Sequence, residues 1–240
     1  MKAMIFAAGL GTRFKPWTDH HPKALAMVNG KSLLQHNIEY LQQYGITEVM
    51  VNVHHFADQI IDAVKVNKGW GSNITISDER DAVLETGGGL LKARHWLQTD
   101  EPFLTLNADI LTNLDIHALI QYHQQQKALI TLAVSERKTS RYFLMDDQQQ
   151  LCGWRNAQTG EEKIVHPHDP LFAKAYSCVV VFESAVFNKI NQTGKFSLTE
   201  TYLDLAKDNR IVGYDHTAAQ DNWVDVGKPE SVAIAEAMFR

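Results

Sequence analysis

The sequence MIFAAGLGTR occupies residues 4–13. Its first half is an apolar run of strand length, and its second half is a turn in which two glycines let a ligand approach the backbone. Backbone N–H groups in such a turn can surround an anion such as phosphate, although a purely structural turn is the alternative. The turn is not a P-loop, because no Lys-Ser/Thr pair follows the second glycine, and Phe14 replaces the third glycine of the dinucleotide fingerprint.

Outward from this turn, short apolar runs alternate with helical patterns, which is typical of strand-helix-strand units feeding a parallel sheet. The expected strands are 4–8, 48–53, 73–77, 103–107 and 129–134, and the expected helices are 32–44, 56–66, 87–97 and 116–126. After about residue 135 the strands shorten, with further strands expected at 175–182 and 223–227 and helices at 196–207 and 229–239. We therefore expect one α/β domain over residues 1–240, with a Rossmann-like mixed, mostly parallel sheet flanked by helices and a small added lobe.

Composition excludes several classes of protein. Of 240 residues, 45% are hydrophobic, which is enough to bury a core and argues against disorder, and the net charge of −5 offers no general grip on nucleic acid. No apolar run approaches the roughly 18 residues of a membrane span, and no signal peptide is evident, so the cytoplasm is the expected compartment. Cys152 and Cys178 are expected to be packing residues, and no zinc site is expected from the adjacent histidine pairs.

Two basic residues follow the glycine turn at short range. Arg13 can grip phosphate oxygens with its guanidinium fork, and Lys23 can place a compact charge near a reacting phosphorus. Lys23 lies in the proline-restricted stretch 16–23, which argues against a place on a solvated helix face. The turn and the two cations together indicate a site for a nucleoside triphosphate.

Two aspartates, Asp109 and Asp225, each end an expected strand. Strand ends are where ligands bind in open α/β sheets, so the two carboxylates could meet in space. Mg²⁺ prefers one or two carboxylates together with substrate phosphates and water. We therefore expect Asp109 and Asp225 to bind Mg²⁺, the alternative being that each simply forms a turn.

Five motifs together resemble the sugar-1-phosphate nucleotidylyltransferases. They are residues 7–13, 22–25, 85–89, 107–109 and 223–227, so the resemblance spans nearly the whole chain. It implies that one half, about 1–135, binds the nucleotide and the other, about 136–240, binds the sugar. It also implies that Arg13 and Lys23 hold the phosphates during transfer, and that Asp109 and Asp225 are the metal ligands. Ala108 stands where the family more often has glycine.

The resemblance further implies the binding residues and the partners, a nucleoside triphosphate and a sugar 1-phosphate. The implied nucleotide-binding residues are Ala7, Ala8, Gly9, Gly11, Thr12, Arg13, Lys23, Glu85, Thr86, Gly87 and Gly88. The implied sugar-binding residues are Asn107, Tyr176, Ser177 and Glu200. In the implied reaction a sugar 1-phosphate oxygen attacks the α-phosphorus and pyrophosphate leaves. No nucleic-acid or membrane partner is expected, and a homo-oligomer is left open.

The form LETGGG at residues 84–89 is most similar to N-acetylmuramate-1-phosphate uridylyltransferases, which favours UTP and N-acetylmuramate 1-phosphate and a place in peptidoglycan recycling. GTP with mannose or heptose 1-phosphate is the alternative, and Cys178 stands where related uridylyltransferases tend to have glycine. A catalytically silent nucleotide-sugar sensor and a choline-phosphate cytidylyltransferase are two further alternatives. The polar segment 156–170 is expected to be a surface hairpin, with a lid as the alternative.

Overall fold

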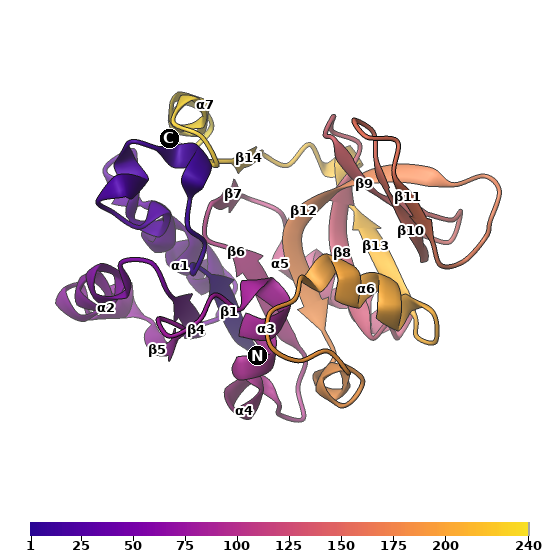
Figure 1. Cartoon of the computed structure of the whole chain (residues 1–240), viewed down its shortest axis with the longest axis horizontal. Helices are drawn as coiled ribbons and strands as arrows, with labels where there is room; N and C mark the ends of the chain where they lie inside the picture. Colours follow the sequence, from indigo (N-terminus) through magenta and orange to yellow (C-terminus); the bar gives the residue numbers. More distant parts are fainter. Residues whose placement is uncertain (240) are drawn as a thin grey trace.

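A large mixed sheet runs through the whole molecule, and the computed structural model describes residues 1–239 of it (Figure 1). The strands of its first half are β1 (Lys2–Phe6), β4 (Glu48–Val53), β5 (Asn73–Asp78) and β6 (Phe103–Asn107). They run parallel in the order β6-β1-β4-β5. The expected α/β fold, with a mixed, mostly parallel central sheet flanked by helices, is confirmed. The parallel neighbours need the helical crossovers that the sequence pattern predicts.

Helices cover both faces of the sheet. One face carries α1 (Leu33–Gln43), α2 (Ala57–Val66) and α5 (Ile116–Gln126). The other face carries α3 (Glu85–Lys92), α4 (Arg94–Leu97) and α6 (Leu198–Ala206). Side chains alternate along β1, so Ala3 and Ile5 pack into the core beneath the first three helices, while Met4 packs into the core beneath the other three. The single helix expected over residues 87–97 is two short helices, α3 and α4, which meet at Ala93. The apolar pattern of the sequence does not reveal this break, because both helices bury apolar residues in the same core.

The second half of the sheet is built around one long strand. It contains β8 (Ile130–Ser135), β9 (Arg141–Met145), β10 (Leu151–Asn156), β11 (Glu162–Ile164), β12 (Phe172–Phe182) and β13 (Ile211–Asp215). Strand β12 pairs antiparallel with β6, β8 and β9, so it joins the two halves in one sheet. Its pairing with β8 shifts register between Tyr176 and Val180, which marks a β-bulge. Strands β10 and β11 form the expected hairpin in segment 156–170.

A small third core lies at the end of the chain, where β7 (Ile110–Thr112) pairs with β14 (Trp223–Asp225). Helix α7 (Glu230–Met238) and the short strands β2 (Met27–Val28) and β3 (Lys31–Ser32) complete this region. Single 3-10 turns lie at Thr12–Phe14, Trp17–Asp19, Lys23–Leu25, Lys68–Gly71, Ser184–Asn188 and Thr217–Ala219. Within residues 1–239, no helix is both long and apolar enough to cross a membrane.

Candidate active site

The glycine turn after β1 keeps free backbone donors. Gly11 has a φ of +61°, and a Cβ there would lie 2.8 Å from Cγ2 of Thr18, so both the conformation and the space require glycine. A Cβ on Gly9 would meet open space instead. No other group of residues 1–239 engages the N–H groups of Gly9, Leu10 and Gly11. The turn can therefore offer several backbone donors to one anion.

The donors at the start of the turn are already used. Oδ1 of Asn52 accepts hydrogen bonds from the N–H groups of Ala7 at 2.7 Å and Ala8 at 3.3 Å. Nδ2 of Asn52 donates to Oε1 of Glu79 at 2.9 Å, and both side chains are almost fully buried. Burial raises the pKa of Glu79. Asn52 and Glu79 thus fix the turn from behind, a role that no sequence motif reveals because they come from β4 and the residue after β5.

A cavity of about 310 Å³ opens beside the turn. The sequence-predicted residues that line it are Ala8, Gly9, Gly11, Thr12, Glu85 and Thr86. The other lining residues are Phe6, Leu10, Asn52, Glu79, Val83 and Leu84. A mixed apolar and polar cavity of this size, next to free backbone donors, suits a nucleoside with its phosphates at the turn.

Gly87 and Gly88 are among the predicted nucleotide-binding residues, but their backbone N–H groups do not face the cavity. Their N–H groups point to the carbonyl oxygen of Phe196, at 2.9 and 3.4 Å, and both residues are buried. A Cβ on Gly88 would lie 2.2 Å from the carbonyl oxygen of Gly194. These glycines allow α3 to pack closely against the segment before α6, so the cavity wall is formed by the residues that precede them.

The two aspartates are brought together by the pairing of β7 with β14. Asp225 lies opposite Ile110 in the antiparallel register, and the N–H of Val226 donates to the carbonyl oxygen of Asp109 at 2.8 Å. Burial, and secondly the negative charge of Asp109, raise the pKa of Asp225. A Cβ on Gly227 would lie 2.6 Å from Oδ1 of Asp225, so this glycine, which belongs to a quoted motif but was not predicted as a site residue, leaves room for the carboxylate.

Each aspartate also meets one of the predicted cations. Lys23 forms an ion pair with Asp109, and NH2 of Arg13 lies 3.7 Å from Oδ2 of Asp225. Oδ1 of Asp225 is buried without a hydrogen-bond partner among residues 1–239. A carboxylate oxygen left unpaired beside a second carboxylate is costly unless a cation meets it, so the donor set fits a divalent metal ion.

Two of the four predicted sugar-binding residues line cavities next to the aspartates. Asn107 lines a cavity of about 140 Å³ together with Lys23 and Asp109. Tyr176 lines a cavity of about 560 Å³ together with Arg13 and Asp225. The two aspartates therefore lie between the cavity of about 140 Å³, which Asp109 lines, and the cavity of about 560 Å³, which Asp225 lines. A reaction between two substrates could take place where these cavities meet the aspartates.

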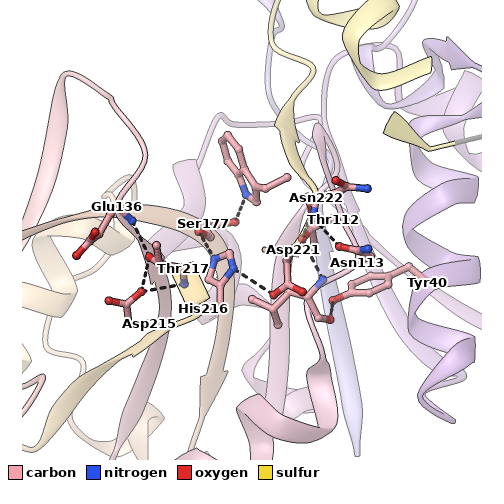
Figure 2. A network of polar contacts seen from close by, with 12 residues as sticks. Tyr40, Thr112, Asn113, Glu136, Ser177, Asp215, His216, Thr217, Asp221 and Asn222 are labelled. Carbon is pink, nitrogen blue, oxygen red and sulfur yellow. Dashed lines mark hydrogen bonds and ion pairs between the residues drawn. The ribbon is translucent and has the colours of Figure 1, made fainter. Parts of the chain in front are cut away.

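Ser177 does not reach either cavity, contrary to the sequence prediction. Its side chain is fully buried, and its hydroxyl lies 2.9 Å from Nε2 of His216, whose Nδ1 lies 3.3 Å from Oδ2 of Asp221 (Figure 2). Such a chain of groups resembles a hydrolase triad, but no substrate can reach a hydroxyl with 0% exposure. Nε1 of Trp223 donates to the carbonyl oxygen of Ser177 at 2.9 Å, so the network ties β12 to the strand that carries Asp225.

Glu200 also lies apart from the aspartates. It is exposed on α6 and lines a separate cavity with Lys163 and Lys207, because the exposed face of α6 points toward the hairpin rather than toward β14. A separate cluster of Asp146, Asp147 and His168 lies in the turn regions of the added lobe, and it shares no residue with the two cavities that Asp109 and Asp225 line. The predicted role of Glu200 therefore has no geometric support in this structure.

Cys178 lies on the wall of the larger cavity, in the bulge of β12. Its φ is +60°, a conformation that glycine adopts freely and other residues adopt at a cost. Burial raises the pKa of its thiol, and the charge of Asp109 adds to this effect. The backbone thus explains why glycine suits this position, and Cys178 remains a neutral packing residue.

Comparisons with known proteins show the family to which the chain belongs. The chain is 30% identical to N-acetylmuramate alpha-1-phosphate uridylyltransferase of Caulobacter vibrioides over 98% of this chain and 95% of that protein. It is 26% identical to mannose-1-phosphate guanyltransferase beta-B of Xenopus laevis, covering all of this chain and 64% of that protein. The crystal structure of HddC from Yersinia pseudotuberculosis with GMP-PN covers 100% of this chain and 99% of its own, with a TM-score of 0.77 at 20% identity. The nucleotidyl transferase family model matches residues 2–239, and the chain belongs to this family.

Proposed function

We propose that the protein transfers the uridylyl group of UTP to N-acetylmuramate 1-phosphate, giving a UDP-sugar and pyrophosphate, with Mg²⁺ as the metal. The observation that carries the proposal is the meeting of Asp109 and Asp225 between two cavities, with Lys23 and Arg13 beside them. A nucleotidyl transfer needs this set of groups, since two anionic substrates must be held with their phosphates in contact.

The nucleotide is expected to lie in the cavity beside the glycine turn. The free N–H groups of Gly9 and Gly11 would face its phosphates, while Glu85 and Thr86 would border the nucleoside. Arg13 and Lys23 would neutralise charge on the phosphates. Each would then turn from its present aspartate partner toward the nucleotide, because the metal ion would take over those carboxylates.

Asp109 and Asp225 would hold Mg²⁺, which when bound supplies charge neutralisation to the phosphates in contact with it. The acceptor phosphate needs no general base, because a phosphate monoester is already largely dianionic near neutral pH. One of its oxygens forms a bond to the α-phosphorus, and the bond from this phosphorus to the bridging oxygen breaks. The bond's electrons leave with pyrophosphate, and no covalent enzyme intermediate is involved.

UTP is favoured over GTP by the likeness to the uridylyltransferase, which is higher and covers more of the relative's length than the likeness to the mannose enzyme. The identities of the residues that border the cavity leave the base choice open to both, because backbone N–H and C=O groups could form hydrogen bonds with either base. GTP with mannose 1-phosphate is therefore the second candidate. The product would be a nucleotide sugar. With N-acetylmuramate 1-phosphate as the acceptor, the reaction would belong to peptidoglycan recycling in the cytoplasm.

Pyrophosphate release tests the proposal. The protein is incubated with Mg²⁺, each of UTP, GTP, CTP and dTTP, and each of N-acetylmuramate, mannose, heptose and N-acetylglucosamine 1-phosphates. The expected result is the fastest release with UTP and N-acetylmuramate 1-phosphate, and fastest release with GTP and mannose or heptose 1-phosphate would select the second candidate. Absence of release with every pair, from protein that unfolds cooperatively, would favour a silent sensor.

Two matched lysine variants distinguish the loss of a cation in the site from the loss of a positive charge elsewhere on the protein. Lys23→Ala should lower turnover by about 100-fold or more, since it removes a cation from the phosphates. Lys15→Ala is the control, because Lys15 lies nearby but is 60% exposed and pairs only with Asp19. Equal losses in the two variants would contradict the assignment of Lys23.

A further inference from the structure

Arg137 is a cation in the larger cavity that no sequence motif marks. It follows β8 in the turn to β9, and it lines the cavity of about 560 Å³ with Arg13 and Asp225. Its guanidinium lies 3.6 Å from the centre of the Trp223 ring, within the range of a cation–π contact. Trp223, two residues before Asp225 in β14, therefore presents the flat ring against which this side chain lies.

The remaining contacts of Arg137 hold it in one orientation. One of its terminal NH2 groups donates to the carbonyl oxygen of Tyr176, in the bulge of β12. Trp223 is itself fixed, since its Nε1 donates to the carbonyl oxygen of Ser177 at 2.9 Å. Arg137 is thus positioned by two strands, β12 and β14, that also form the walls of the cavity. Such a preorganised fork loses little freedom when it binds an anion.

One donor of this fork is left unused. Nε of Arg137 is buried and has no hydrogen-bond partner among residues 1–239. This Nε is as closed to a ligand as the Ser177 hydroxyl, so an anion in the cavity would meet Arg137 through its terminal N–H groups. The Tyr176 carbonyl is the one hydrogen-bond acceptor that Arg137 contacts among residues 1–239.

The charges around the cavity indicate what that group is. The cavity is lined by three arginines, Arg13, Arg137 and Arg141, against one carboxylate, Asp225. Its other polar lining residues include the neutral side chains of Thr139, Ser140, Asn156, Gln158 and Tyr176. Neutral hydroxyl and amide groups suit the hydroxyls of a sugar, whereas a buried guanidinium suits a phosphate.

We propose that Arg137 binds the phosphate of the sugar 1-phosphate and so sets the acceptor against the reacting nucleotide. This inference rests on the proposed function, since the acceptor must occupy the cavity that meets Asp225. Arg137 supplies the positive charge that lets a dianion approach a centre already holding two aspartates. Its flat fork, lying on Trp223, directs one phosphate oxygen toward the nucleotide side.

Kinetics of Arg137→Ala test the proposal. The KM for N-acetylmuramate 1-phosphate should rise about 10- to 100-fold, as expected for loss of a charged hydrogen-bonding group, while the KM for UTP stays within about two-fold. Arg137→Lys should recover part of the acceptor KM, because it restores a charge but not the fork. Arg155→Ala is the matched control, since Arg155 lies in the same lobe, pairs with Glu162 and does not line the cavity.

An unchanged acceptor KM in Arg137→Ala, or an equal rise in both KM values, would overturn the proposal. A purely structural role would instead lower the unfolding temperature and kcat while leaving the acceptor KM alone, so thermal unfolding of both variants accompanies the kinetics. That pattern would also count against phosphate binding.

A binding measurement separates this inference from the proposed function. If the wild type shows no turnover with any substrate pair, the function fails, and calorimetric titration with inorganic phosphate then judges the site alone. Phosphate binding that weakens at least 10-fold in Arg137→Ala but not in Arg155→Ala would support an anion site. No binding to the wild type, or equal binding to all three proteins, would reject it.

Discussion

Replacing Cys178 with glycine should relieve backbone strain in the wall of the larger cavity, the one that Arg13 and Asp225 line. The residue sits in the β12 bulge with a φ of +60°. A residue with a Cβ pays about 1–2 kcal/mol for this conformation, whereas glycine does not. Cys178→Ala keeps the Cβ and hence the strain, so it is the proper reference for the glycine variant.

The expected magnitude follows from two opposing terms. Glycine usually lowers stability by about 0.5–1 kcal/mol relative to alanine, because the unfolded chain gains freedom. Relief of about 1–2 kcal/mol at a left-handed position outweighs this loss. Cys178→Gly should therefore be about 1 kcal/mol more stable than Cys178→Ala, which for a chain of this size is about 2–4 °C in unfolding temperature.

Thermal unfolding of four variants measures this difference. Cys152 is the matched control, because it is 1% exposed and lies in β10 without a positive φ. There the order should reverse, with Cys152→Ala more stable than Cys152→Gly. If glycine is as unfavourable at position 178 as at position 152, the strain argument is wrong.

Four further predictions concern a proposed metal ligand, the buried network around His216, which carries two of them, and an ion pair of Lys174. Asp225→Asn should lower magnesium-dependent pyrophosphate release at least about 100-fold while the protein still unfolds cooperatively, and full activity would refute the metal assignment. Ser177→Ala should lower the free energy of unfolding by about 1–2 kcal/mol, measured in urea, because it leaves buried His216 without its 2.9 Å partner; an unchanged midpoint would show that the contact adds nothing. Burial lowers the pKa of His216, so protonation favours the unfolded chain, and stability measured from pH 7 to 5 should fall below about pH 6.5; a His216→Gln variant should lose this part of the pH dependence. Lys174→Met should cost about 2 kcal/mol at pH 7, because it leaves Asp215, which lies 2.6 Å from the Lys174 amine, without its cation. Burial raises the pKa of Asp215, but hydrogen bonds from Lys174 and Thr217 outweigh burial and lower this pKa. The difference in stability between Lys174→Met and the wild type should therefore vanish as the pH falls below about 4. A difference in stability that persists there would contradict the ion-pair explanation.

Local sequence determines the strands, turns and helices whose formation depends on residues close together in the chain. The sequence around Gly9 predicts a buried strand and a phosphate-type turn, and Gly11 must be glycine because its φ is +61° and Thr18, only seven residues away, leaves no room for a Cβ. The apolar periods predict nearly every helix, since α1 and α5 follow their expected ranges closely. Such features depend on neighbours within a few residues, and the sequence alone carries that information.

Tertiary structure decides which distant residues meet. Asp109 and Asp225 come together only because β7 pairs with β14, and Arg137 enters the cavity only because Trp223 lies beneath it. Ser177 follows Tyr176 directly and lies at the bulge in β12, yet its side chain is buried against His216 and lines neither cavity. Side-chain direction at a bulge and pairing between distant strands depend on long-range packing, and spacing along the chain does not encode them.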